Sequence, residues 1–364
     1  MGGIIIDIGH PGHYYLFRDI ARHFISQNET VVITGRHNPF IRSLLNDGGF
    51  DFHSFGKKKN NIILKYLTQV NNIIRAYRLI RSERISLGLG VSMTLPLISK
   101  YTSSFKTIAF DDDDRDATPT YAKYANMADV IMTPAALAHE KRGDHHLTYP
   151  GFHELVYLHP KRFTPDENIL ERLGVKNGEP YFVIRFNSFK AHHDIGEKGL
   201  SQEQKKAIIE RLSGEGRIFI STEGDPGPDF EQYKLPVRPD EIHSVLYYAK
   251  MFVGDSQTMT SEAAILGTPA LKCNTFAGRL SIPNELENKY GLCYAFFPGR
   301  FEQMMTRMNE LLRMPGLKEE WQRRRQVMLA ETIDVASFLI WFIGHFPQSR
   351  NEYRNDPVFW KRFQ

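Results

Sequence analysis

The strongest constraint on the fold is an alternation of short apolar runs with longer amphipathic segments. The short runs are rich in Ile, Val or Phe and are bounded by Gly, Asp or Pro, which is typical of strands. In the first half they are Ile4–Ile8, Thr30–Thr34, Ile85–Leu89, Lys106–Phe110 and Asp129–Thr133. The helical segments between them are Tyr14–Ser26, Phe40–Asn46, Asn61–Arg84 and Thr120–Ala128. This order predicts an α/β fold, a parallel sheet covered by helices on both faces.

The alternation pauses between Pro150 and Gly178, where Pro and Gly residues indicate a linker. It resumes with strands at Tyr181–Arg185, Arg217–Ser221, Met251–Val253 and Ala270–Cys273. The accompanying helices are Ser201–Leu212, Asp240–Lys250, Met259–Leu266, Phe301–Leu312 and Lys318–Ala330. We therefore expect two Rossmann-like, doubly wound domains facing across a cleft. They span residues 1–155 and 179–364, joined by a linker over 156–178, and the terminal helices are free to pack back on the first domain.

Composition supports this organisation. The chain has 364 residues, which suits two domains of about 100–200 residues each. With 41% hydrophobic and 24% charged residues, it is not an intrinsically disordered chain. Two cysteines, Cys273 and Cys293, make neither a disulfide framework nor a four-ligand zinc site.

Targeting signals are not apparent. The run Ile4–Ile6 is too short for a secretion signal and leads directly into Asp7. The longest apolar run, Val335–Phe346, falls short of the roughly 18–20 residues that a membrane span needs. We therefore expect a cytoplasmic protein with reduced thiols.

In open α/β sheets, ligands bind beyond the carboxyl ends of the strands, so the loops after the strands are the candidate sites. The first such loop is Gly9-His10-Pro11-Gly12-His13. Its glycines and proline allow a close approach of backbone to a ligand, and His titrates near neutrality. We expect a functional role for His13 and a structural role, such as capping the next helix, for His10.

The second candidate loop runs from Gly254 to Ala264 and opens a helix. Ser256, Gln257 and Thr258 at a helix N-terminus form a good diphosphate site, because N–H donors and the helix dipole point outward. Glu262, one to two turns inside, is placed to accept hydrogen bonds from sugar hydroxyls. An ordinary N-cap at Asp255 or Ser256 is the simpler alternative, and the residue types alone do not separate the two.

Two further loops carry charged side chains. Phe186–Asp194 follows a strand, and with Arg185 it offers Lys190, His192 and His193 to phosphate oxygens. Its His-His-Asp run also suggests a metal site, but no second ligand set accompanies it. Asp111–Asp114 follows another strand, and its carboxylates suit Mg²⁺, the hydroxyls of an acceptor, or only solvent.

Known phosphate and nucleophile motifs are missing from the sequence. It has no GxxxxGK[ST], GxGxxG or GxSxG, which disfavours a P-loop NTPase, an NAD-dependent oxidoreductase and an α/β-hydrolase. We expect no cofactor and no bound metal.

The run Gly254-Asp255-Ser256, Ser261–Ala264 and Gly267-Thr268-Pro269 resembles the nucleotide-sugar motif of GT-B proteins. It is similar to that of the hydrolysing UDP-GlcNAc 2-epimerases and the MurG-type glycosyltransferases. The Gly9–His13 loop resembles the first loop of the MurG type. From Ile4 to about Phe346 the chain resembles the DUF354 family, through His10–His13, Phe110–Asp113, Tyr149–Glu154, Gly254–Thr268 and Ile333–Ile343.

The resemblance implies a GT-B fold and roles for individual residues. Glu262 matches the acid that holds the ribose, and Ser256 matches a diphosphate contact, with Gln257 and Thr258 beside it. His13 matches the loop histidine near the acceptor, with His10 and Gly12 in the same acceptor-side loop. Two departures from the epimerase pattern disfavour an epimerase. Ile184-Arg185-Phe186 stands where the epimerases have a His-Arg catalytic segment, and the acidic residues of the epimerases' first domain are only loosely matched by Asp111–Asp114.

The leading hypothesis is therefore a GT-B glycosyltransferase in cell-surface polysaccharide or glycolipid synthesis. Its substrates would be a nucleotide-sugar donor and a saccharide or lipid-linked acceptor. His13 or an acid such as Asp112 or Asp113 would be the general base, and Arg185 would stabilise the leaving diphosphate. The alternatives are a UDP-N-acetylhexosamine 2-epimerase and a non-catalytic nucleotide-sugar-binding protein.

Charge is concentrated in one segment. The chain carries a net charge of +4, whereas Lys57–Arg84 contains eight basic residues and the single acid Glu83. Such a segment suits an acidic partner surface or is simply a solvated helix face. We predict that its apolar stripe, Ile63, Leu67, Val70, Ile74 and Tyr77, packs on the sheet. We further predict that the basic residues, with the tail Phe359–Phe363, attach the protein peripherally to an anionic membrane, on its inner face, and that no nucleic acid is bound.

Overall fold

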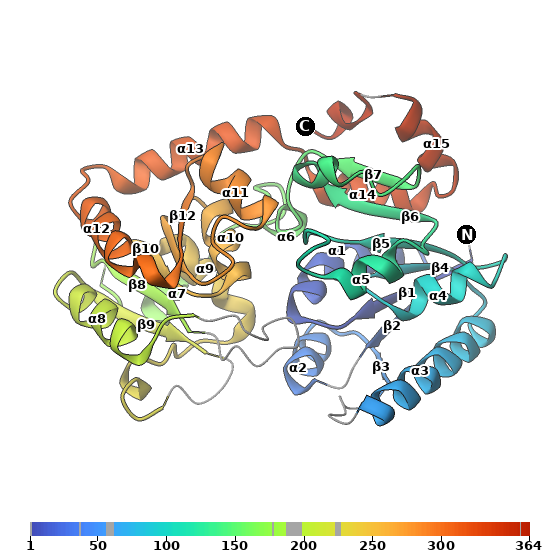
Figure 1. Cartoon of the computed structure of the whole chain (residues 1–364), viewed down its shortest axis with the longest axis horizontal. Helices are drawn as coiled ribbons and strands as arrows, with labels where there is room; N and C mark the ends of the chain where they lie inside the picture. The colour runs from blue at the N-terminus through green and yellow to red at the C-terminus, as the bar shows by residue number, and fades with distance from the viewer. Residues whose placement is uncertain are drawn as a thin grey trace. The chain divides into compact units, whose positions relative to one another are not determined.

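The computed structural model describes residues 2–35, 38–55, 62–176, 178–186, 199–222, 227–356 and 358–364, and no side chains of residues 62–66. Lys57–Lys59, Ile63, Lys65, Lys190, His192, His193 and Asp194 lie outside this description. The chain forms two compact units, Met1–His159 with Thr332–Gln364, and Pro160–Glu331. We call them unit 1 and unit 2 and describe each by itself (Figure 1).

Unit 1 is a seven-stranded parallel sheet with the strand order β3-β2-β1-β4-β5-β6-β7. Its elements before unit 2 are β1 (Gly3–Ile8), α1 (Pro11–Ser26), β2 (Val31–Gly35), α2 (Pro39–Asp47), β3 (Phe52–Ser54), α3 (Ile62–Ser82), β4 (Ile85–Gly90), α4 (Thr94–Lys100), β5 (Lys106–Phe110), α5 (Pro119–Ala125), β6 (Val130–Pro134), η1 (Ala135–Glu140), β7 (His146–Tyr149) and α6 (Leu155–Leu158). After unit 2 the chain adds α14 (Val335–Gly344), α15 (Gln348–Asn355) and η6 (Phe359–Phe363).

Unit 2 is a five-stranded parallel sheet with the order β12-β11-β10-β8-β9. Its elements are α7 (Asn168–Arg172), β8 (Tyr181–Arg185), α8 (Gln202–Ser213), β9 (Arg217–Ser221), η3 (Glu231–Tyr233), η4 (Pro239–Glu241), α9 (Ile242–Tyr248), β10 (Met251–Gly254), α10 (Gln257–Ile265), β11 (Ala270–Cys273), α11 (Ser281–Asn288), β12 (Cys293–Phe296), η5 (Pro298–Arg300), α12 (Phe301–Leu312) and α13 (Leu317–Glu331). The two parallel sheets make this an α/β protein.

The central strands are mostly apolar because helices cover both faces of each sheet. In β1, Ile4, Ile5, Ile6 and Ile8 are all buried. Helix α1 begins with Pro11 at its first position and buries Phe17, Ile20, Ala21 and Phe24, which are spaced to form one helical face. After α10, the chain turns at Gly267, whose φ is +73°. A Cβ there would lie 2.5 Å from Gln322 Nε2, so the turn needs glycine.

The division of the chain differs from the expected boundaries at several points. Unit 1 ends at His159 instead of residue 155, and residues 160–178, which we expected to form a linker, belong to unit 2. Residues 332–364 belong to unit 1, where α14 contacts α1 and α6, in agreement with the option left open for the terminal helices.

The C-terminal residues bear on two expectations. By length and composition, Leu317–Gly344 qualifies as a membrane-span candidate, contrary to the expectation from the shorter apolar run Val335–Phe346. In the structure this stretch forms α13 and α14, and α14 buries Phe338 and Phe342 in unit 1. The tail was also expected at a membrane surface, but Phe359 is buried and Phe363 packs on Phe338. These two rings therefore pack around α14, whereas Lys361 and Arg362 are exposed, and membrane contact by the tail stays a prediction.

The predicted packing of the α3 stripe is wrong. The helix covers the sheet with Asn72, Ala76 and Ile80, which are buried. The residues of the predicted stripe lie on another face of the helix, and those with described side chains, Leu67, Val70, Ile74 and Tyr77, are exposed. The helix therefore has two apolar faces, and sequence spacing alone did not distinguish the one that packs.

Candidate functional site

The loop after β1 holds two histidines through backbone hydrogen bonds. His10 is the N-cap of α1, and its Nδ1 accepts from the N–H of Gly12 at 3.2 Å, as expected for a structural role. Nδ1 of His13 accepts from the N–H of Gly9 at 3.2 Å. A neutral ring that accepts at Nδ1 carries its proton on Nε2. Both imidazoles therefore present an Nε2–H donor.

His13 is held neutral by its surroundings. Desolvation, together with the neighbouring His10, lowers the pKa of His13 to about 3, and Asp112 only partly opposes this. Its Nδ1 lone pair already accepts from Gly9 and its Nε2 carries the ring proton, so neither nitrogen is free to take a proton from a hydroxyl. The geometry therefore suits His13 as a hydrogen-bond donor better than as the general base we expected.

The carboxylates of the loop after β5 have different roles, and Asp111 has a structural one. Asp111 is buried and forms an ion pair with the buried guanidinium of Arg142. Arg142 also donates to the backbone oxygen of Asp113 at 2.8 Å, which fixes the course of the loop. Burial raises the pKa of Asp111 to about 6, with Arg142 opposing the shift. Asp111 is therefore occupied in holding the loop.

Asp112 is the accessible carboxylate of this loop, and it pairs with a histidine that the sequence did not single out. Its Oδ2 lies 3.4 Å from Nδ1 of His153, and its side chain is 45% exposed, whereas His153 is buried. Burial opposes the charged carboxylate, but His153 outweighs it and lowers the pKa of Asp112. Burial likewise favours a neutral imidazole, yet Asp112 raises the pKa of His153. The two groups stabilise each other as an ion pair.

His153 is positioned by aromatic packing. Its ring stacks on Tyr149 with 6.3 Å between centroids and lies 6.4 Å from the ring of Phe110. Its Nε2 is buried and has no hydrogen-bond partner among the described residues. Residues 112 and 153 meet because β5 pairs with β6 and β6 with β7, so the segments after β5 and β7 share one edge of the sheet. The only sequence signal was the family resemblance over Tyr149–Glu154, which assigned no role to His153.

The pKa of Asp113 is raised, whereas that of Asp112 is lowered. Burial and the nearby charges of Asp112, Asp111 and Asp114 raise the pKa of Asp113 well above its ordinary value. Neighbouring carboxyl groups with pKa values moved apart are typical of a base and an acid in one site. The loop therefore places a carboxyl group with a lowered pKa, Asp112, beside one with a raised pKa, Asp113.

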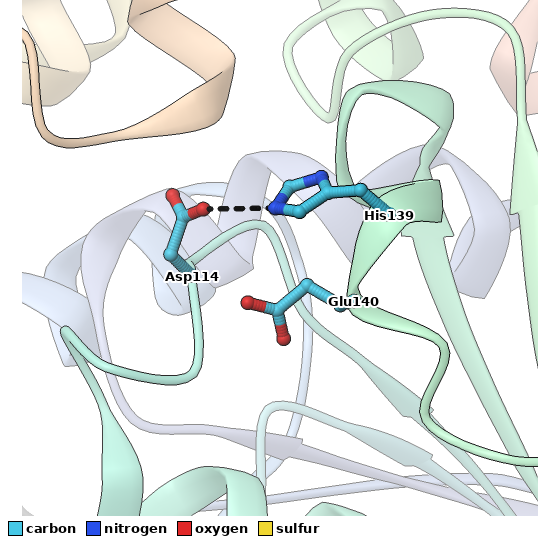
Figure 2. Close-up of side chains that lie close together, drawn as sticks. All are labelled: Asp114, His139 and Glu140. Atoms are coloured by element: carbon cyan, nitrogen blue, oxygen red, sulfur yellow. Dashed lines mark ion pairs between the residues drawn. The ribbon is translucent and has the colours of Figure 1, made fainter.

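Two acidic clusters raise the question of a metal ion. Figure 2 shows Asp114 and His139 pointing toward each other beside Glu140, with His139 Nε2 3.8 Å from Asp114 Oδ1. However, Glu140 Oε2 lies 2.8 Å from Arg115 Nε and 3.0 Å from Arg142 Nε. Arg142 also neutralises Asp111 in the second cluster, Asp111–Asp113. Guanidinium groups on these carboxylates compete with a cation, so the donor sets fit an ion-pair network better than a metal site.

In unit 2 the corresponding loop lies between β10 and α10. Ser256 is the N-cap, and its Oγ accepts from the N–H of Met259 at 3.5 Å, so the capping alternative holds. The N–H groups of the first turn, including those of Gln257 and Thr258, have no acceptor within a helix. Both side chains are partly exposed, whereas Ser256 is buried. Any anion bound here would therefore meet backbone N–H groups, while the oxygen of the Ser256 hydroxyl accepts the capping hydrogen bond.

Two basic residues lie on the strands that flank β10. Arg185 ends β8, where its backbone oxygen accepts from the N–H of Asp255 at 3.1 Å and its Nη1 donates to Ser221 Oγ at 3.1 Å. Lys272 in β11 is fully buried and donates to Oε1 of Gln257. Burial lowers the pKa of Lys272 to about 8. Lys272 was not predicted from the sequence, because a lysine in a short apolar strand carries no motif.

Glu262 lies on the sixth position of α10 and is buried. Its Oε1 lies 3.1 Å from Nε2 of His243, which comes from α9 and packs edge-on against Phe163. Glu262, which we expected to bind sugar hydroxyls, is therefore part of a buried pair with His243 that the sequence did not predict.

Comparison with known proteins places this geometry in context. Residues 3–286 match the family described as "Protein of unknown function (DUF354)". An uncharacterised protein of Methanocaldococcus jannaschii is 22% identical over 285 residues, which cover 74% of this chain and 80% of that protein.

Solved structures share the fold along nearly the whole chain. A UDP-N-acetylglucosamine 2-epimerase has a TM-score of 0.65 at 15% identity, with 98% of each chain covered. The UDP-GlcNAc 2-epimerase of M. jannaschii, in complex with UDP-GlcNAc and UDP, has a TM-score of 0.61 at 11% identity, with 90% of this chain and 99% of that chain covered. A glycosyltransferase from Rickettsia africae has a TM-score of 0.61 at 12% identity, with 97% and 99% covered. The fold is thus GT-B-like, shared with both classes of enzyme.

Proposed function

This chain belongs to the DUF354 family, and from that premise we propose that it is a glycosyltransferase that uses a nucleotide-activated sugar. The observation that carries the proposal is the pair formed by Asp112 and His153 beyond the carboxyl ends of the unit 1 strands. Oδ2 of Asp112 lies 3.4 Å from Nδ1 of His153. A partly exposed carboxylate held ionised by a buried histidine is a suitable general base for a hydroxyl group.

In the proposed reaction, Asp112 takes the proton of an acceptor hydroxyl. The acceptor oxygen then forms a bond to the anomeric carbon, and the bond from that carbon to the diphosphate breaks. The electron pair leaves with the nucleoside diphosphate, and the proton remains on Asp112 until it exchanges with water. Asp112 is the catalytic residue in this scheme, and His153 is a positioning residue that keeps it ionised.

His13 serves as a donor in this proposal. Its Nε2–H would hydrogen-bond to acceptor or sugar oxygens, because its Nδ1 already accepts from the backbone. We assign the role of second donor to Asp113, whose pKa is raised above its ordinary value. This arrangement replaces the base role first expected for His13.

Unit 2 would bind the nucleotide. The first-turn N–H groups of α10, with Arg185 and Lys272 nearby, suit the negative charge that grows on the leaving diphosphate. We assign Glu262 to the ribose hydroxyls and His243 to the orientation of its carboxylate. Nucleotide-bound epimerases of this fold, such as the complex with UDP-GlcNAc and UDP, support a nucleotide sugar as the ligand class.

An assay with and without acceptor tests the proposal. Purified protein would be incubated with a panel of nucleotide sugars, alone and with lipid and saccharide extracts, and the products followed by ¹H and ³¹P NMR. We expect nucleoside diphosphate to be released only when an acceptor is present. Inversion at C2 of the sugar without acceptor would identify an epimerase instead. Binding without turnover in any extract would indicate a non-catalytic binding protein.

A further inference from the structure

Helix α3 of unit 1 exposes a line of large apolar side chains to solvent. Leu67 is 57% exposed, Val70 40%, Ile74 44% and Tyr77 43%. They are three, four and three residues apart, so they lie on one face of the helix. The helix does not need them for packing, because Ala76 and Ile80 pack against the core on the opposite side, with Ile73 and Leu79 partly buried beside them.

This line differs from the other exposed apolar side chains of unit 1. Among the described residues, Ile25, Phe40, Tyr101 and Val358 are also exposed, but each lies on a different segment. Scattered single residues of this kind are ordinary on protein surfaces, whereas a contiguous patch marks an interaction site. Figure 1 shows α3 as a long helix on the outside of its unit.

Arginines accompany the apolar line. Arg75, Arg78, Arg81 and Arg84 are exposed, and Glu83 is the only acid between residues 67 and 84. Arg78 follows Ile74 by four residues and Arg81 follows Tyr77 by four, so both continue the exposed apolar face. A helix with apolar side chains beside a row of basic ones is typical of segments that lie in a membrane interface.

We propose that α3 docks unit 1 onto the surface of an anionic phospholipid bilayer. Leu67, Val70, Ile74 and Tyr77 enter the headgroup region, and Arg78 and Arg81 bind lipid phosphates. Arginine is well suited to this contact, because its guanidinium binds phosphate through two parallel hydrogen bonds. The proposal does not depend on the glycosyltransferase assignment.

Charge and chemistry disfavour the other occupants of this face. A second copy of the chain would bring the guanidinium rows of two α3 helices together, with only Glu83 of each helix to neutralise them. A nucleic acid would use the arginines but would leave the aliphatic side chains of Leu67, Val70 and Ile74 exposed, because most of its contacts are polar. A bilayer can bury the apolar side chains and can also bind the basic ones through its phosphates.

Co-sedimentation with vesicles tests the proposal on the full-length protein. We expect binding to phosphatidylcholine–phosphatidylglycerol vesicles at low salt, little binding to phosphatidylcholine alone, and release at high salt. Double charge reversal, Arg78→Glu with Arg81→Glu, should lower the partition coefficient at least about 25-fold, since each basic residue contributes about fivefold near such a surface. Leu67→Ser with Ile74→Ser should lower it about tenfold.

Matched controls separate docking from general effects. Lys100→Glu with Lys123→Glu makes the same charge change on exposed residues of α4 and α5, and Tyr101→Ser removes an exposed aromatic ring elsewhere in unit 1. We expect both controls to bind vesicles like the original protein. All variants should keep the original circular dichroism and melting curve, because every altered side chain is exposed.

Three results would overturn the proposal. The first is equal recovery in the supernatant with anionic and neutral vesicles at low salt. The second is a concentration-dependent dimer in sedimentation velocity that Leu67→Ser with Ile74→Ser abolishes, without vesicle binding. The third is binding of single- or double-stranded oligonucleotides that needs Arg78 and Arg81 but not Leu67 and Ile74, again without vesicle binding.

Discussion

Helices α1 and α10 each begin just after a buried parallel strand, and each has a side chain that caps its first turn. His10 Nδ1 accepts from the N–H of Gly12 in α1, and Ser256 Oγ accepts from the N–H of Met259 in α10. The neighbouring strands make the two sites different. Near α1, the segments after β5 and β7 supply Asp112 and His153, whereas near α10 the strands β8 and β11 supply Arg185 and Lys272.

The same strand–loop–helix arrangement thus has opposite electrostatic surroundings in unit 1 and unit 2. Both helix N-termini carry partial positive charge. In unit 1 carboxylates are placed beside that charge, which gives proton-transfer groups. In unit 2 cations are added to it, which gives a site for an anion. Four substitutions, taken from the largest expected effect to the smallest, test this contrast.

Asp112→Asn should remove the general base while leaving the anion site of unit 2 intact. We expect kcat to fall by about 10²–10⁴ with an unchanged dissociation constant for the donor. Quenched-flow measurement of nucleoside diphosphate release, combined with donor titration, checks both parts.

Two controls give this result its meaning. Asp116→Asn changes an exposed carboxylate of the same loop and should leave kcat unchanged. His13→Ala removes a donor and should lower kcat less than Asp112→Asn does. A larger loss in His13→Ala would return the base role to His13.

Glu262→Ala should weaken nucleotide binding by about 10- to 100-fold, the worth of losing charged hydrogen bonds to ribose. It also leaves His243 without this carboxylate in a buried site, so the melting temperature should fall. Glu262→Gln keeps a hydrogen-bonding side chain beside His243 and should restore most of the stability but not the affinity. Isothermal titration with a nucleoside diphosphate measures the affinity. Unchanged affinity in a folded Glu262→Ala protein would remove Glu262 from the site.

These residues differ in how far the sequence could predict them. The central strands were predictable because burial on both faces demands continuous apolar runs, as in Ile4–Ile8. The missed strands β3, β7 and β12 are all sheet edges, which pair on one side only and tolerate residues such as His53 and His146. His153, His243 and Lys272 lack a local signal, because each meets its partner only when separate strands or helices pack together.

His153→Asn should shift the pH dependence of kcat. The Asn amide can replace Nδ1–H as a donor to Asp112 but carries no charge, so the effect of burial, which raises the pKa of Asp112, meets less opposition. The reaction needs ionised Asp112 and is lost as pH falls through its pKa. The acidic limb of the kcat profile should therefore shift to higher pH, with about a tenfold loss at pH 6. A uniform loss at every pH would indicate that His153 only supports the fold.

Lys272→Met should have the smallest effect and acts on unit 2 alone. Burial lowers the pKa of Lys272 to about 8, below the ordinary value of 10.5, so its charge is lost as pH rises through about 8. If that charge assists diphosphate binding, affinity should fall between pH 7 and pH 9 in the original protein. Lys272→Met fills the same buried space without charge, so affinity should be about fivefold weaker at pH 7 and flat across this range. Lys234→Met, at an exposed lysine of unit 2, should keep the original profile. Calorimetric titrations with nucleoside diphosphates at several pH values measure this. An unchanged pH dependence in Lys272→Met would limit Lys272 to holding Gln257, and would leave the anion site of α10 to its N–H groups and Arg185.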